Sequence, residues 1–133
     1  MDHEAGLRAL LGPSASLITD SEITLSYSRD QAPFAPHEAA AIVLLAKSTE
    51  EVSKAVAYAN THNIPVVARG AGSGLSGGAN ATSSTLVISL EKMNWILELD
   101  TTNLIARVEA GVINLDLDKA AEAHGLAYLP DPA

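Results

Sequence analysis

The chain has 133 residues, of which 47% are hydrophobic, and its formal net charge at pH 7 is −8. This is the size of one domain with a buried core, and that core must be aliphatic because only 4% of the residues are aromatic. The negative charge excludes ordinary binding to a nucleic-acid backbone or an anionic membrane surface, since both need clustered Lys and Arg. No cysteine is present, so disulfides and thiolate metal sites are excluded as well.

The amino terminus and the apolar segments predict a cytoplasmic protein without a transmembrane segment. Residues 1–4 are acidic and lack the basic and then apolar layout of a signal peptide. The longest apolar run, residues 39–46, is far shorter than the ~20 residues needed to cross a bilayer. The four His residues have no metal-ligand spacing, so we expect no metal site.

The first part of the chain carries weak structural signals. Residues 6–11 predict a short helix that Gly12 and Pro13 end. Residues 13–37 are rich in Ser, Thr, Pro and Asp, which predicts an irregular arm. We therefore divide the chain into an amino-terminal helix and arm, residues 1–36, and a main domain, residues 37–133.

The main domain opens with the pattern of a βαβ unit. Residues 41–46 are apolar on both alternating faces, as expected for a strand that is covered on both sides. Ser48 and Glu51 form a capping box that begins a helix, and this helix should end near residues 62–63. Residues 64–68 form the next predicted strand, and a right-handed crossover would connect the two strands.

Strands dominate the rest of the pattern. We expect strands over residues 86–90, 96–99 and 104–110, the last two joined by a hairpin turn. Asn114 should cap a final helix with Asp116 and Asp118 at its positive end, and residues 127–129 should begin another strand. The predicted fold class is α+β, with a βαβ start, a small mixed sheet and two flanking helices.

Between the βαβ pattern and the later strands lies a glycine loop, residues 69–78, with the sequence RGAGSGLSGG. Glycine permits positive φ and lets a ligand approach the backbone, and successive N–H groups in such a stretch can form a concave anion site. Arg69 is the only charged residue between residues 63 and 85. An acidic chain that keeps this region free of carboxylates favours an anionic ligand here, although a ligand-free surface turn is the alternative.

Two common phosphate motifs do not explain the loop. Residues 72–77 match the pattern G-x-G-x-x-G, but that motif must open a helix, and residues 78–85 have no helical period. A Walker loop is excluded because Gly78 stands where Lys is required. The glycine loop thus lies between two strands with no helix after it. In this arrangement its backbone N–H groups can form a concave site, called a nest, for a diphosphate.

Residues 64–78, IPVVARGAGSGLSGG, resemble the first FAD-binding segment of the FAD-linked oxidases with a vanillyl-alcohol-oxidase (PCMH) type flavin domain. Within these oxidases the sequence is most similar to the branch of the glycolate oxidase FAD-binding subunit and D-lactate dehydrogenase. The resemblance runs from about Ser26 to the last residue and includes residues 27–30, 108–112 and 130–132.

This resemblance implies that the glycine loop wraps the FAD diphosphate and that the carboxyl-terminal residues border the path toward the flavin. Some relatives attach the flavin covalently through a His in this loop, and the absence of a His here implies non-covalent FAD. The cofactor-binding residues carried over by position are Arg69, Gly70, Ala71, Gly72, Ser73, Gly74, Leu75, Ser76 and Gly77, with Pro130, Asp131 and Pro132.

The resemblance also implies the chemistry, which is oxidation of a 2-hydroxy acid such as glycolate or D-lactate by hydride transfer to the flavin. Members of the family continue into a second flavin segment and a substrate domain, so the chain resembles an amino-terminal fragment that is inactive alone. We assign no catalytic residue before Ala133. Two alternatives stay open, a non-catalytic module for another phosphate ligand and a nicotinamide-dependent dehydrogenase.

Overall fold

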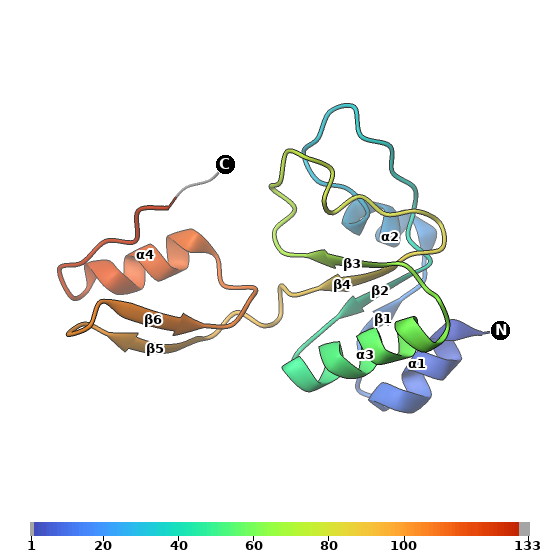
Figure 1. Cartoon of the computed structure of the whole chain (residues 1–133), viewed down its shortest axis with the longest axis horizontal. Coiled ribbons are helices and arrows are strands. Elements are labelled where there is room, and N and C mark those ends of the chain that lie inside the picture. The colour runs from blue at the N-terminus through green and yellow to red at the C-terminus, as the bar shows by residue number, and fades with distance from the viewer. Residues whose placement is uncertain (1, 131–133) are drawn as a thin grey trace.

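The computed structural model describes residues 2–130, which form two units joined by the segment after residue 89 (Figure 1). The first unit is a four-stranded sheet with helices on both faces, and the second is a hairpin covered by one helix. The helices are α1 (His3–Leu11), α2 (Ser21–Tyr27), α3 (Thr49–Thr61) and α4 (Asn114–Glu122). The strands are β1 (Leu17–Ile18), β2 (Ile42–Leu45), β3 (Val66–Arg69), β4 (Leu86–Ser89), β5 (Ile96–Asp100) and β6 (Ile105–Val108).

The strand order of the first sheet is β1-β2-β4-β3. β4 pairs in parallel with both neighbours, so that Val87 lies between Val43 of β2 and Val67 of β3, and β1 pairs antiparallel with β2. The sheet is therefore mixed, as the sequence predicts. The βαβ prediction needs a correction, because β2 and β3 are parallel but β4 is inserted between them. Local periodicity predicts strands but does not predict which strands become neighbours.

Alternating side chains of the two central strands build two cores. Leu44 of β2 and Ile88 of β4 face α1 and α3, where they pack with Leu7 and with the small Ala55 and Ala59. On the opposite face Val43 and Val87 pack with Ala40 and Ala81, and Tyr27 of α2 lies against this cluster. Every residue of β4 is buried. The prediction that the strand at residues 41–46 is covered on both faces is confirmed, since Ile42, Val43 and Leu44 of β2 are all buried.

The third helix of the sheet unit, α3, begins and ends as its sequence predicts. Ser48 is the N-cap and accepts a hydrogen bond from Glu51 N at 3.2 Å, and Asn63 takes a positive φ of 54° after the last turn. The capping box is only half formed. The Glu51 carboxylate accepts from the backbone N–H of Lys47 at 2.8 Å, one residue before the expected partner.

The predicted irregular arm contains a short strand, β1, and the seven-residue helix α2, so this part of the prediction is wrong. Asp20 caps α2 by accepting from Glu22 N and Ile23 N. Ser and Thr are weak helix formers, so the composition of this segment does not predict a helix. Tertiary packing stabilises it instead, since Thr24 is fully buried. Residues 2–130 therefore contain four helices, and α2 is the one that the sequence does not predict.

In the second unit the hairpin of β5 and β6 is confirmed, with its turn organised by the Asp100 carboxylate, which accepts from Thr102 N and Asn103 N. Other details differ from the predictions. Ile113 occupies the N-cap position of α4, and the Asn114 side chain donates to Pro130 O at 3.3 Å instead of capping.

The role predicted for Asp118 and the last predicted strand also need correction. Asp118 accepts from Tyr128 N at 2.7 Å, beyond the first turn of α4, so it anchors the following segment rather than the helix dipole. Residues 127–129, inside the described part of the chain, are irregular. Among the helices of residues 2–130, none has the length and apolarity that crossing a lipid bilayer requires.

The two units meet where Gly111 lies against the segment that leaves β4. Its backbone N–H donates to Met93 O at 2.8 Å. A Cβ at this position would lie only 1.8 Å from Leu90 O, so no larger residue fits without moving the backbone. Met93 is buried in the core of the first unit, and this contact therefore connects the second unit to that core.

Replacing Gly111 with Ala should lower the free energy of unfolding by about 1–3 kcal/mol, because the new methyl group must displace backbone atoms. Gly78→Ala is the matched control, since nothing lies within 4 Å of its added Cβ, and it should change stability by less than about 0.5 kcal/mol. Urea unfolding of the purified protein measures both. Equal stability of the two variants would contradict the close approach.

Candidate cofactor-binding site

The candidate site is built on the β3–β4 crossover, residues 70–85. Neighbouring parallel strands need a connection that returns along the whole length of the sheet, and this connection is usually a helix. Here residues 70–85 contain no helix and consist of bends and turns. The crossover includes most of the glycine loop, so its backbone polar groups must find partners outside regular secondary structure.

Part of that support comes from a clamp segment, residues 28–38, which follows α2 and lies beside the crossover (Figure 1). Gln31 N donates to Gly74 O at 2.9 Å, and Ala81 N donates to Ser28 O at 2.9 Å. The Asn80 side chain donates to two carbonyl oxygens of the clamp segment, at 3.2 and 3.1 Å. These hydrogen bonds join residues 28–36 to the crossover, across the domain boundary predicted at residue 36. The division of the chain into residues 1–36 and 37–133 stays a prediction.

Asp30 occupies the centre of this interface and is only 7% exposed. Its backbone N–H donates to Asn80 Oδ1 at 3.0 Å, and its own Oδ1 accepts from Ala32 N at 2.9 Å. The backbone N–H of Ala32 lowers the pKa of the Asp30 carboxyl most strongly, and burial partly opposes this effect. The backbone N–H groups of Ala79, Gly77 and Gly78 lower this pKa further.

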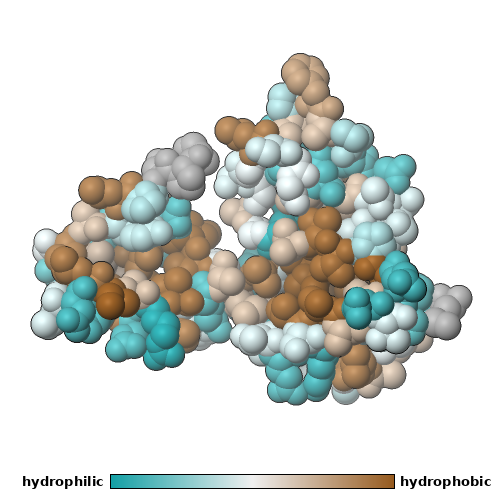
Figure 2. Space-filling model, viewed as in Figure 1, coloured by the Kyte–Doolittle hydropathy of each residue, from teal (hydrophilic) through white to brown (hydrophobic). Residues whose placement is uncertain are grey.

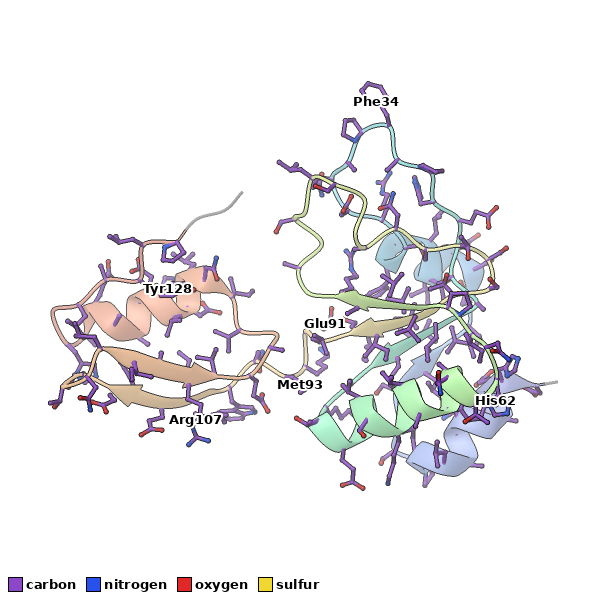
Figure 3. All side chains as sticks on the ribbon, viewed as in Figure 1. Phe34, His62, Glu91, Met93, Arg107 and Tyr128 are labelled. Atoms are coloured by element: carbon purple, nitrogen blue, oxygen red, sulfur yellow. The ribbon has the colours of Figure 1, made fainter. Side chains whose placement is uncertain are left out.

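A cleft of about 270 Å³ lies between the glycine loop and the second unit. The walls come from the residues after β3 and β4, and from the segment that connects β6 to α4. The site is therefore at the carboxyl ends of parallel strands, the usual place for a ligand in open α/β sheets. Figure 2 shows the surface hollowed between the two units, and Figure 3 shows Glu91 at their junction. The lining residues are Gly70, Ala71, Ser73, Glu91, Asn94, Ala110, Gly111, Val112, Ile113 and Asn114.

The part of the cleft wall that the glycine loop forms contains backbone N–H groups without a protein acceptor among the described residues. Within residues 2–130, the backbone N–H groups of Gly70, Ala71 and Ser73 donate to no protein acceptor. Gly72 has a φ of 73°, a conformation that L side chains rarely adopt, and a Cβ on Gly70 would meet only open space. This wall can approach an anionic group closely and offer it several N–H groups.

Arg69 does not point into the cleft. Its guanidinium donates to Arg29 O and lies 5.7 Å from the centre of the Tyr27 ring. A Cβ on Gly72 would clash with this guanidinium, since it would lie 2.4 Å from Nη2. The side chain therefore packs beneath the loop and connects it to the clamp segment.

Glu91 is the charged side chain that does line the cleft. Its carboxylate accepts from the Tyr27 hydroxyl at 3.4 Å and lies 3.7 Å from Lys92 Nζ. Burial and the Glu91 carboxylate together raise the pKa of Tyr27, which keeps that hydroxyl protonated as a donor. Because the Glu91 carboxylate repels anions, an anion in the cleft would contact the loop backbone rather than Glu91.

The structure brings together only part of the residues predicted to bind the cofactor. Gly70, Ala71 and Ser73 line the cleft, whereas residues 74–77 face the clamp segment or solvent. Pro130 is exposed and contacts Asn114, while Asp131 and Pro132 lie outside the described residues. The sequence analysis did not assign the wall at residues 110–114 to the site, although Gly111, within residues 108–112 of the resemblance, was an available signal. All twelve assignments stay predictions.

Comparisons with known proteins show the family of the chain. Residues 40–133 match the model of a family described as FAD binding domain. The chain belongs to this FAD binding domain family. It is 43% identical over 91 residues to glycolate oxidase subunit GlcD of Bacillus subtilis (strain 168), an alignment that covers 68% of this chain and 19% of the relative. It is 44% identical over 110 residues to D-lactate dehydrogenase of Archaeoglobus fulgidus, covering 80% of this chain and 25% of the relative.

Two solved structures share the fold of this chain. Alkyldihydroxyacetonephosphate synthase superposes with a TM-score of 0.81 at 22% identity, over 97% of this chain and 26% of that chain. p-Cresol methylhydroxylase with substrate bound superposes with a TM-score of 0.74 at 25% identity, over 95% of this chain and 26% of that chain. The predicted resemblance and the predicted fold class are therefore confirmed. The FAD binding domain chain described here spans about a fifth to a quarter of the length of these relatives.

The wall at Gly70, Ala71 and Ser73 fits the diphosphate of FAD. The three N–H groups are free, Gly72 has a positive φ, and no side chain blocks the approach at Gly70. A diphosphate is the part of the cofactor that carries charge, and backbone dipoles can bind it without a cation. Gly70, Ala71 and Ser73 would hold the diphosphate, and the bound cofactor would supply the redox chemistry.

The Asp30 carboxyl should titrate below the ordinary Asp value of about 3.9, because backbone N–H groups stabilise its charged form. A pH titration followed by NMR of the Asp30 carboxyl carbon measures this pKa. Because the folded-state pKa is depressed, the stabilisation is complete above the unfolded pKa and is lost as the pH falls through the folded pKa. A midpoint at or above the ordinary value would contradict the arrangement.

Proposed function

We propose that this chain binds FAD non-covalently and belongs to a longer flavin-dependent oxidoreductase that acts on a 2-hydroxy acid such as glycolate or D-lactate. The observation that carries the proposal is the set of unpaired backbone N–H groups on the cleft wall, within a chain of the FAD binding domain family. Bound FAD would accept a hydride from the carbon that bears the substrate hydroxyl. The residues of this chain hold and orient the cofactor.

The relatives support the substrate class. The Bacillus subtilis relative is a glycolate oxidase subunit and the Archaeoglobus fulgidus relative is a D-lactate dehydrogenase. Glycolate and D-lactate are both 2-hydroxy acids. Each alignment covers a quarter of the relative or less, so the substrate proposal concerns the full-length protein. Its catalytic groups would lie outside this chain, and a cytoplasmic setting stays a prediction from the composition.

The non-covalent linkage is supported by the loop sequence. Residues 69–78 contain no His that could form a bond to the flavin ring. The nicotinamide alternative is disfavoured because residues 70–85 form no helix, whereas a dinucleotide motif of that kind places the pyrophosphate at a helix N-terminus. The remaining alternative is a module that holds another phosphate ligand in the same cleft.

The full-length protein should be yellow, and acid precipitation should release its flavin into the supernatant, because no covalent bond retains it. Gly72→Val should abolish flavin retention, since the positive φ is strained for Val and the side chain displaces the loop. Gly125→Val is the matched control, with a φ of 71° and open space around it outside the loop. Visible spectra of the three proteins measure the effect.

Three results would contradict this part of the proposal. Flavin that stays in the acid precipitate would show a covalent bond, and equal flavin loss in both Val variants would show general destabilisation. A colourless protein that takes up no added FAD would favour the module for another phosphate ligand.

Glycolate or D-lactate should bleach the flavin absorbance of the full-length protein under anaerobic conditions, because hydride transfer reduces the flavin. Acetate and propionate are the matched controls, since they keep the carboxylate and lack the hydroxyl to be oxidised. Stopped-flow spectroscopy measures the rate. Retained FAD with no bleaching by either hydroxy acid would refute the substrate class and leave FAD binding standing.

A further inference from the structure

The cleft has two walls with opposite chemistry. The loop wall offers backbone N–H groups at Gly70, Ala71 and Ser73, whereas the segment after β4 brings the Glu91 carboxylate and the Asn94 amide to the same cleft. We propose that Glu91 accepts a hydrogen bond from a sugar or ribityl hydroxyl of the cofactor, next to the diphosphate on the loop. This inference rests on the proposed function and deepens it, because it assigns a second part of FAD to the cleft.

The turn that carries Glu91 is held on both sides. Leu90 N, directly after β4, donates to Arg69 O at 2.9 Å, and Met93 N donates to Leu90 O at 2.9 Å. Met93 is buried in the core of the first unit, so the turn cannot move without disturbing that core. Glu91 therefore extends from a fixed backbone at the junction of the two units (Figure 3), as a binding residue requires.

Part of the acceptor capacity of the Glu91 carboxylate is unused. Its Oε1 atom accepts from the Tyr27 hydroxyl at 3.4 Å and lies 3.7 Å from Lys92 Nζ. Its Oε2 atom accepts no hydrogen bond from residues 2–130. A carboxylate has about four lone-pair sites for donors, and the Glu91 side chain is 39% exposed. A ligand hydroxyl in the cleft can therefore reach it.

The contacts with Lys92 and Tyr27 do not explain why a carboxylate lines this cleft. The side chains of Glu91 and Lys92 are both exposed, and ion pairs of this kind contribute little to stability. The distance of 3.4 Å to the Tyr27 hydroxyl is longer than the ~2.7 Å that is usual for a hydrogen bond between two oxygens. Neither contact requires a carboxylate opposite a wall that is suited to an anion, whereas a donor supplied by the ligand does.

An uncharged donor fits this wall better than an anion or a cation. An ionised carboxylate accepts hydrogen bonds and donates none, so it repels phosphate. No group of three His, Cys, Asp or Glu side chains within residues 2–130 could hold a metal ion, which disfavours a cation between Glu91 and the diphosphate. A hydroxyl both donates and accepts. The Asn94 amide, which has no hydrogen-bond partner in the described part of the chain, can donate to the hydroxyl oxygen.

The two walls would then select the ligand together. A diphosphate without hydroxyls meets the N–H groups of the loop but is repelled by Glu91. A diphosphate with a neighbouring hydroxyl gains a charge-assisted hydrogen bond instead. In FAD the ribose and the ribityl chain flank the diphosphate, and both carry hydroxyls. Glu91 thereby favours a diphosphate of this kind over inorganic pyrophosphate.

The test compares the full-length apoprotein with its Glu91→Ala variant by isothermal titration calorimetry. The dissociation constant of FAD should rise about tenfold or more, because a hydrogen bond to a charged acceptor is lost. The dissociation constant of inorganic pyrophosphate, which has no sugar or ribityl hydroxyl, should stay equal or fall, because the repelling carboxylate is gone. General damage to the loop would weaken the binding of both ligands alike.

ADP and FMN identify the hydroxyl. ADP carries the ribose and FMN carries the ribityl chain, so the one whose dissociation constant rises about tenfold in Glu91→Ala contains the partner of Glu91. Glu91→Gln keeps an acceptor oxygen and should lose less affinity. Glu50→Ala is the matched control, because it also removes a carboxylate paired with a Lys, on α3 and outside the cleft. Its FAD dissociation constant should change less than about twofold.

Several results would overturn the proposal. One is unchanged affinity of Glu91→Ala for FAD, ADP and FMN, and another is an equal loss of affinity for pyrophosphate. An effect that disappears in EDTA would also overturn it, because a divalent cation would then be the partner of Glu91. If Glu91→Ala does not fold, the same comparison of FAD with pyrophosphate in Glu91→Gln decides.

The same titrations separate this inference from the proposed function. Wild-type protein that binds ADP through Glu91 but does not bind FAD refutes the proposed function only. Wild-type protein that binds FAD with an affinity that does not depend on Glu91 refutes this inference and leaves FAD binding standing.

Discussion

The parallel pairing of β3 with β4 is the constraint on which the rest of the structure depends. It obliges residues 70–85 to return along the sheet, and a glycine-rich sequence cannot do so as a helix. The crossover is therefore irregular, and its backbone groups must be satisfied by the clamp segment or left for a ligand. The clamp segment satisfies groups at Gly74 and Ala81, whereas the N–H groups of Gly70, Ala71 and Ser73 have no protein acceptor within residues 2–130.

This arrangement explains how an acidic chain can offer an anion site. The net charge is −8, and no Lys or Arg side chain lines the cleft, within the part of the chain that the structure describes. In the proposed site, attraction would come instead from backbone dipoles at Gly70, Ala71 and Ser73. Arg69 contributes indirectly, because its guanidinium connects the loop to the clamp segment.

The two units of the chain depend on each other at the cleft. The loop wall belongs to the sheet, whereas residues 110–114 belong to the second unit, and Gly111 connects that unit to the segment after β4. The cleft thus lies beside a contact that joins the two units. Residues on β6 are exposed along the whole strand, in contrast to the buried β4, so the first unit has the larger apolar core.

By itself the sequence determined the apolar strands at residues 42–45 and 86–89, the helix after Ser48 and the glycine loop with its family, because these depend on local periodicity and composition. Only the tertiary structure decided that β4 lies between β2 and β3, that α2 forms in a Ser- and Thr-rich arm, and that Asp30 lies against the loop. Asp30 and Asn80 are 50 positions apart, and no local pattern encodes such a pair. Their contact follows from the packing of α2 and the crossover on the same face of one sheet.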